Sequence, residues 1–194
     1  MKKILSLALV LVMVLSVAAL VGCSGDKAPS GDDAATLKFG LGVVSSYGEA
    51  KDADGETNGQ AEFNTTAVAV LLDAEGKIAA IDLDTAQIKP TWTSEGKRIA
   101  VEDLRTKYEK GTDYGMAAYG KKHDGSEGKA LEWNEQADAF MATAKGKTVA
   151  EVKALMAEDG YAQGDLATAG CTINVNDFVS ALEKAVNSAA DSKA

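Results

Sequence analysis

The sequence predicts an α+β fold in which helices pack on an antiparallel β-sheet, within a single domain. Strand patterns fill the first half of the chain after its N-terminal segment, and helical patterns fill the last third. A short Asp-Ala-Glu-Gly turn at residues 73–76 separates two apolar runs, which is typical of a β-hairpin. Strands that precede helices along a chain favour an antiparallel sheet with helices packed on it.

Three strands are expected in the first half of the chain. Residues 37–47 are apolar with interspersed glycines, residues 61–73 are rich in threonine and valine, and residues 76–83 complete the hairpin. Residues 51–60, between the first two strands, are polar and predict a loop. Residues 87–100 show a further strand–turn–strand pattern around a central Ser-Glu-Gly turn.

The middle of the chain has weaker signals. Residues 101–110 predict a short helix, and residues 114–128 predict a loop because they are rich in glycine and lysine. Trp92 and Trp133 are expected to be core residues rather than stacking platforms for a ligand.

The last third predicts three helices. The first covers residues 130–144, and Thr148 with Glu151 has the spacing of a capping box that opens a second helix through Met156. Asn176 is expected to cap the third, residues 177–189. The positions expected to face the core are Leu131, Trp133, Ala137, Phe140, Met141, Phe178, Ala181, Leu182, Ala185 and Val186.

The N-terminus has the pattern of an exported protein. Its first three residues include two lysines, residues 4–21 are apolar except for two serines, and Gly22 precedes Cys23. This segment resembles the lipobox of bacterial lipoproteins, in which the chain is cut before the cysteine and the thiol takes a diacylglyceryl group. An uncleaved transmembrane helix is the alternative, because the apolar run is almost long enough to span a bilayer.

The lipoprotein interpretation divides the chain into a signal peptide (residues 1–22), a lipidated Cys23 with a flexible polar tether (23–36) and a folded domain (37–194). Acyl chains such as palmitate would hold this domain at the extracytoplasmic face of the membrane. Cleavage leaves 172 of the 194 residues and removes two lysines, so the formal charge goes from −9 to −11. Such acidity argues against binding to nucleic acid.

Several chemistries are hard to build from this composition. His123 is the only histidine, so a Ser–His–carboxylate triad or a histidine-based zinc site would have to depend on it. The Asp52-Ala-Asp54-Gly55 run lacks the spacing of a calcium loop, and phosphate-binding and dinucleotide fingerprints are absent. No metal site is predicted. With Cys23 lipidated, Cys171 has no partner for an intrachain disulfide.

The stretch from residue 165 to residue 178 is the candidate functional segment. Gly170 allows a tight turn, and Asn174 leads into the expected start of the last helix, where backbone N–H groups and the helix dipole favour a phosphate. The Thr172 hydroxyl belongs to the same turn. The alternative is an ordinary capping turn without a ligand.

Ala169-Gly170-Cys171-Thr172, with Asp165 upstream, resembles the Ser-Gly-Ala-Thr region of the bacterial FMN-binding domain family. The hairpin at residues 73–76 and the Tyr-Gly-Met run at residues 114–116 are also similar to features of that family. The lipobox together with the Val-Val-Ser-Ser, Asn-Thr-Thr and Glu-Trp-Asn-Glu-Gln runs resembles a set of Gram-positive FMN-binding-like lipoproteins.

The resemblance implies a flavoprotein that transfers electrons. FMN would be joined through its phosphate to Thr172, or held there noncovalently, while the loop around Tyr114 covers the flavin ring. A flavin transferase would make the covalent link, and redox proteins or quinones would be the electron partners. The cofactor-binding residues that the resemblance implies are Gly170, Cys171, Thr172, Asn174, Tyr114, Gly115 and Met116.

The chain departs from the family motif at two positions, and its acidic residue is one position further from the glycine than in the family. Ala169 replaces a serine or threonine, and Cys171 replaces an alanine. Cys171 would either lie beside the flavin or phosphate, with a thiol pKa lowered by the helix N-terminus, or be buried and inert. Three functions follow: a tethered flavin carrier, a binding or envelope module without flavin, and an enzyme acting on envelope polymers. The shortage of histidine argues against the third.

Overall fold

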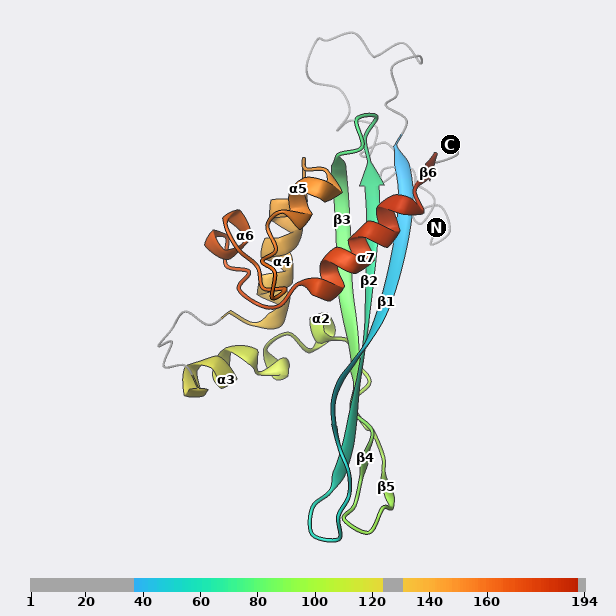
Figure 1. Cartoon of the computed structure of the whole chain (residues 1–194), viewed down its shortest axis with the longest axis vertical. Coiled ribbons are helices and arrows are strands. Elements are labelled where there is room, and N and C mark those ends of the chain that lie inside the picture. The colour runs from blue at the N-terminus through green and yellow to red at the C-terminus, as the bar shows by residue number, and fades with distance from the viewer. Residues whose placement is uncertain (1–36, 124–130, 192–194) are drawn as a thin grey trace, which may run out of the picture. The chain divides into compact units, whose positions relative to one another are not determined.

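The computed structural model describes residues 37–123 and 131–191, which lie in one compact unit, Ala35–Ala194. Its antiparallel sheet has the strand order β5-β4-β2-β1-β6, and β3 pairs with β2 beside β4 (Figure 1). The strands are β1 (Lys38–Lys51), β2 (Gly59–Leu72), β3 (Ile78–Ile88), β4 (Thr91–Trp92), β5 (Arg98–Ile99) and β6 (Ala190–Asp191). The predicted α+β fold is confirmed.

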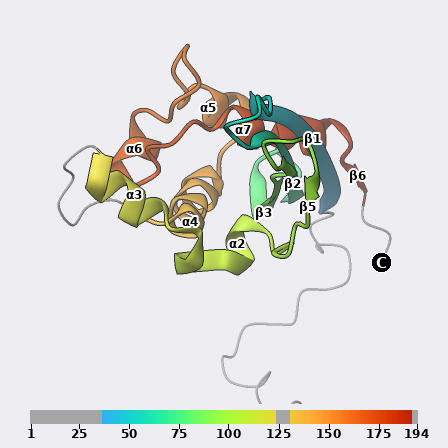
Figure 2. The ribbon, with the colours of Figure 1, turned by 90° about the horizontal axis from the view of Figure 1, so that it is seen from below.

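The helices follow the first five strands along the chain. They are α2 (Lys107–Lys110), the 3-10 helix η1 (Gly111–Tyr114), α3 (Met116–His123), α4 (Trp133–Ala144), α5 (Val149–Lys153), α6 (Asp165–Thr168) and α7 (Asn176–Asn187). Figures 1 and 2 show α4, α5, α6 and α7 gathered on one side of the sheet.

The predicted β2–β3 hairpin is confirmed, and the reason is local. The Asp73 side-chain oxygen accepts hydrogen bonds from the backbone N–H groups of Glu75 (3.1 Å) and Lys77 (2.8 Å). These bonds satisfy donors that the turn leaves without strand partners. The strands β1, β2 and β3 are longer than expected, so the predicted polar loop shrinks to residues 52–58.

Side chains alternate across the sheet, and only one face is covered by helices. In β2, Val68, Val70 and Leu72 are buried, whereas Ala67 and Ala69 between them are partly exposed. Such alternation is expected where an antiparallel sheet packs on one side only. The covered face therefore contains the core.

The core forms where α4 and α7 meet the sheet. Phe178 of α7 makes edge-to-face contacts with Trp133 (ring centroids 5.6 Å apart) and Phe140 (5.2 Å) of α4. All three rings are almost completely buried, which confirms the expectation that Trp133 is a core residue. The aromatic contacts lock the two helices together over β2 and β3.

Helix α7 packs against β1 at a distance that only glycine permits. A Cβ atom added at Gly40 would overlap the carbonyl oxygen of Ala185, and one added at Gly42 would overlap the carbonyl oxygen of Ala181. Both alanines are fully buried. The glycines in the first strand are therefore packing residues that bring the helix backbone onto the sheet.

The C-terminal end of α7 also covers the free edge of β1. The Ser188 hydroxyl accepts a hydrogen bond from the Leu41 N–H (3.0 Å) and donates one to the Leu41 carbonyl (2.8 Å). The Lys184 ammonium donates to the Val43 carbonyl (3.0 Å). Because edge strands present unpaired backbone groups, these bonds reduce the tendency of β1 to pair with another strand.

The helix boundaries differ from the predictions at several places. The helices η1 and α6 were not predicted, and α7 ends at Asn187 rather than at residue 189. Residues 116–123 form α3 where a loop was predicted, while only residues 107–110 of the expected helix at 101–110 are helical, as α2. The Thr148 capping box is confirmed, but its helix ends at Lys153. Asn176 is the first residue of α7 rather than its cap: the cap position is Val175, which makes no side-chain cap bond, and Asn174 accepts the Asn176 N–H (3.1 Å).

No helix among the described residues is long and apolar enough to span a membrane. Residues 1–36, which contain the predicted signal peptide, the lipidation site Cys23 and the tether, lie outside the described residues. Residues 124–130, which include the start of the helix predicted at 130–144, lie outside them as well.

We expect Gly42→Ala to lower the free energy of unfolding by about 1–3 kcal/mol, because the added methyl group forces α7 away from β1. Urea denaturation of both proteins measures the difference. Ser45→Ala, at an exposed position of the same strand, is the control and should change the value little. Equal stability of Gly42→Ala and the parent chain would contradict the close contact.

Candidate functional site

The loop between α6 and α7 contains the candidate motif, and its shape depends on Gly170. This residue has a φ of +104°, which other residues rarely adopt, and a Cβ there would lie 2.8 Å from Cδ1 of Leu131. The next residue turns back, and the Cys171 N–H donates to the Leu166 carbonyl (3.0 Å). The glycine predicted to allow a tight turn does so.

Cys171 is a core residue. Its side chain is fully buried, and burial raises the pKa of its thiol to about 11. A thiol activated by a helix N-terminus would have a lowered pKa instead. Of the two alternatives for this residue, the structure therefore favours the buried, inert cysteine.

Thr172 is exposed and is held by one side chain of α4. Both its backbone N–H (2.9 Å) and its hydroxyl (3.2 Å) donate to the Oε1 atom of Gln136. Gln136 is only 4% exposed. Thr172 is thus an exposed residue whose backbone and hydroxyl are both bonded to a buried side chain.

Gln136 also joins this loop to the second predicted segment. Its Nε2 atom donates to the Leu131 carbonyl (3.1 Å) and contacts Sδ of Met116 at 3.3 Å. The Met116 N–H donates to a carboxylate oxygen of Glu132 (2.9 Å). Residues 114–116 and 170–172, which are far apart in sequence, are therefore linked through the first turn of α4.

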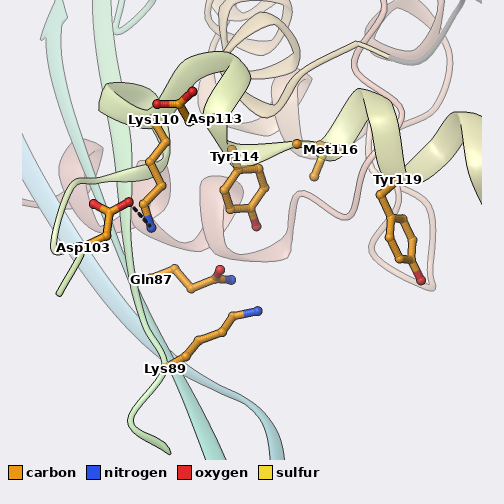
Figure 3. A pocket seen from close by; sticks show the side chains of 9 residues that line it. Gln87, Lys89, Asp103, Lys110, Asp113, Tyr114, Met116 and Tyr119 are labelled. Carbon is orange, nitrogen blue, oxygen red and sulfur yellow. Dashed lines mark ion pairs between the residues drawn. The ribbon is translucent and has the colours of Figure 1, made fainter. Parts of the chain in front are cut away.

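Tyr114, Gly115 and Met116 line a pocket of about 530 Å³ (Figure 3). The Tyr114 ring is half-buried, and burial raises the pKa of its hydroxyl. Figure 3 shows Tyr119 of α3 on the same side of the pocket as Tyr114. Gln87 of β3 points into the pocket. The remaining lining residues are Lys89, Asp103, Lys110 and Asp113.

The charges around this pocket are largely paired. Lys89 forms an ion pair with Glu62 (2.9 Å), and Lys110 lies 3.9 Å from Asp103. Arg105 bridges Asp103 (3.1 Å) to Asp113 (3.0 Å). The pocket therefore has tyrosine and methionine side chains on one side and a balanced polar rim on the other.

A second pocket, of about 310 Å³, opens at the first turn of α7. Asn174 lines it, two residues after Thr172, together with Asp177, which accepts a hydrogen bond from the Ser46 hydroxyl (2.5 Å). A carboxylate already occupies this helix N-terminus, so the dipole is partly compensated within the protein. Lys107 of α2 also lines this pocket and contributes a positive charge to it.

Lys107 is a functional candidate that sequence reasoning missed. Its ammonium lies 5.2 Å from the Tyr114 ring centroid and 5.6 Å from that of Trp133. Burial lowers the pKa of this group to about 8, although attraction by Glu62 and Asp177 opposes the change. Cation–π contacts with two rings offset part of the cost of removing the charge from water.

The sequence contained signals for only some of these residues. Gln136 follows Trp133 by three positions and precedes Phe140 by four, so a polar side chain on the apolar face of this helix could have been noticed. Lys107 and Glu132 had no comparable signal, because their surroundings come from distant elements. Among the described residues no group of three or more His, Cys, Asp or Glu side chains is placed to hold a metal ion.

Comparison with known proteins found no matching family model, no similar curated protein and no similar solved structure.

The lowered pKa of Lys107 predicts how stability depends on pH. Between about pH 8 and pH 10.5, the unfolded chain keeps a proton that the folded chain has lost, so the free energy of unfolding should rise with pH. One proton contributes at most about 1.4 kcal/mol per pH unit. Lys107→Met should lose this rise, which chemical denaturation across that range measures.

The control for this experiment is Lys97→Met, at an exposed position in the β4–β5 turn. It reports the effect of removing a lysine charge while Lys107 still lines the second pocket. If Lys107→Met and the parent chain differ by the same free energy at every pH, the ammonium is not removed from water.

Burial of Cys171 predicts slow reaction with thiol reagents. In the mature chain with Cys23→Ser, Ellman's reagent at pH 8 should react with Cys171 at least about a hundredfold more slowly than in guanidinium chloride. A Cys171→Ala, Thr172→Cys chain moves the thiol by one residue to the exposed position and should react fast. Equal rates in the two native chains would contradict the burial.

Proposed function

We propose that this protein is a lipid-anchored flavin carrier at the extracytoplasmic face of the membrane. FMN is attached by a phosphoester to the Thr172 hydroxyl, and the anchor is Cys23. The bound flavin supplies the redox chemistry, accepting and releasing electrons between partner proteins or quinones. The chain itself supplies attachment, orientation and a defined environment for the ring.

The observation that carries the proposal is the exposed residue Thr172 on a fixed backbone. Its amide and hydroxyl both bond to Gln136, which is buried and bonded on its other side to the Leu131 carbonyl. A residue that a flavin transferase modifies must be accessible, yet an electron carrier must hold its cofactor at a constant position. Thr172 meets both requirements.

The adjoining pocket supports the same function. It is formed by the loop that the family resemblance assigns to the flavin ring, and its volume of about 530 Å³ is within the ordinary range for small-molecule sites. The rings of Tyr114 and Tyr119 and the thioether of Met116 offer the flat and polarizable contacts that an aromatic ring system prefers. Gln87 offers a hydrogen-bonding group on the opposite side.

A binding module without flavin is the second candidate, and the motif departures favour it. Cys171 replaces a smaller residue of the family motif and fills the core. Ala169 removes a hydroxyl from the same turn, at an exposed position. If a flavin transferase needs those side chains, the chain keeps the fold and the pocket but not the covalent link.

Coexpression with a flavin transferase tests the proposal. The denatured protein should show flavin fluorescence in a gel, and mass spectrometry should find one FMN, less water, on the peptide that contains Thr172. Thr172→Ala should abolish the signal and leave thermal unfolding almost unchanged, because the side chain is exposed. Thr168→Ala, in the neighbouring helix α6, is the matched control and should keep the flavin.

Three other results have definite meanings. Covalent flavin on Thr172→Ala would show that the attachment residue is wrong. A dark gel band from a yellow native protein would mean noncovalent binding. A dark band from a colourless protein would favour the module without flavin.

A further inference from the structure

The face of the sheet opposite the helices is apolar and uncovered in the described chain. Phe39, Leu41 and Val43 of β1 are 50%, 52% and 45% exposed on it. We call the part of this surface at residues 39–43 of β1 the outer face; it consists of Phe39, Leu41, Val43, Ala67, Ala69, Leu71, Ala80, Asp82 and Asp84. Farther along the strands the same side of the sheet continues with Tyr47, Phe63 and Ile88. Large contiguous apolar surfaces of this kind mark sites of association.

The rest of the mature chain contains no suitable cover. The parts outside the described residues are the tether up to residue 36, residues 124–130 and residues 192–194. Their sequences contain only small, polar and charged residues and one proline, with no large apolar side chain. The proposed cleavage before Cys23 therefore leaves no segment of this sequence that suits the outer face.

We propose that the outer face binds the outer face of a second copy of this chain, related by a two-fold axis that runs parallel to the strands between β1 and β2. Large side chains of β1 lie beside small ones of β2 at two of the three levels, since Leu41 pairs with Ala69 and Val43 with Ala67, whereas Phe39 pairs with Leu71. The two-fold rotation places Leu41 and Val43 of each copy over the alanines of the other. Such interdigitation is what packed sheets require.

The charged residues of the outer face fit the same rotation. Val43, Ala67 and Asp84 occupy one level across the three strands, and the Lys184 ammonium lies at the Val43 carbonyl on the free edge of β1. Asp82 lies two residues away from Asp84 on β3. The rotation brings β3 of one copy over this edge of the other, so carboxylates face ammonium groups at both rims. Complementary charge of this kind fixes the register of an interface.

The rotation also agrees with the proposed membrane anchor. An axis parallel to the strands keeps both copies of β1 in the same direction, so both tethers leave from the same end and can reach one membrane. Two chains confined to one surface meet at a raised effective concentration. An axis perpendicular to the strands would place large rows on large rows and send the tethers to opposite ends.

The size of the surface predicts a weak dimer. Half-exposed large side chains contribute on the order of 100 Å² each, so each copy offers on the order of 400–500 Å² together with the alanines. The total of about 800–1,000 Å² is at the low end for specific interfaces. We therefore expect reversible association that does not depend on flavin.

Sedimentation equilibrium of the mature chain with Cys23→Ser tests the proposal over a range of concentrations. The parent chain should form a reversible dimer, and Leu41→Asp should weaken it at least about tenfold. Leu104→Asp is the matched control, because Leu104 is 66% exposed away from the sheet and should leave the dimer unchanged. Thermal unfolding checks that each variant remains folded.

A charge exchange tests the orientation of the two copies. Asp82→Lys and Lys184→Asp should each weaken the dimer about fivefold, and the two changes together should restore it to within about twofold. Lack of restoration would overturn the proposed axis. A chain that is monomeric at all concentrations, or one that instead binds phosphatidylcholine vesicles through Leu41, would overturn the second copy as the occupant.

Discussion

The close approach of α7 to β1 is the constraint on which the rest of the structure depends. Gly40 and Gly42 allow the helix backbone to reach the strand, and the buried alanines Ala181 and Ala185 complete the contact. The position of α7 then determines which contacts form at both ends of the helix. At its C-terminus it covers the edge of β1 through Ser188, and at its N-terminus it positions the loop that contains the candidate motif.

Gln136 connects the packed core to the surface loop that contains Thr172. A buried amide is costly unless its donors and acceptors are bonded, and here both ends of the side chain have partners. The buried glutamine therefore holds the exposed residue Thr172 in place. Cys171, for which the sequence left a reactive and an inert interpretation open, contributes packing.

The two faces of the sheet have different roles. The covered face supplies the core and supports the pockets near Tyr114 and Asn174. The outer face supplies neither, which leaves its large β1 side chains available for association. Because the two faces are separate, the proposed flavin binding and the proposed self-association would be independent of each other.

The sequence by itself determined the order of elements, because hydrophobic alternation, the Asp73 turn and the Thr148 capping box are local properties. It also determined the inward faces of α4 and α7 through helical periodicity. It did not reveal α3, which forms in a stretch predicted to be a loop, or that Asn176 is the first residue of α7 rather than its cap. Only the tertiary structure decided that Cys171 is buried, that Gln136 joins two distant segments, and that Lys107 lies between two aromatic rings. Such surroundings depend on contacts between residues far apart in the chain, and local sequence patterns carry no information about these contacts.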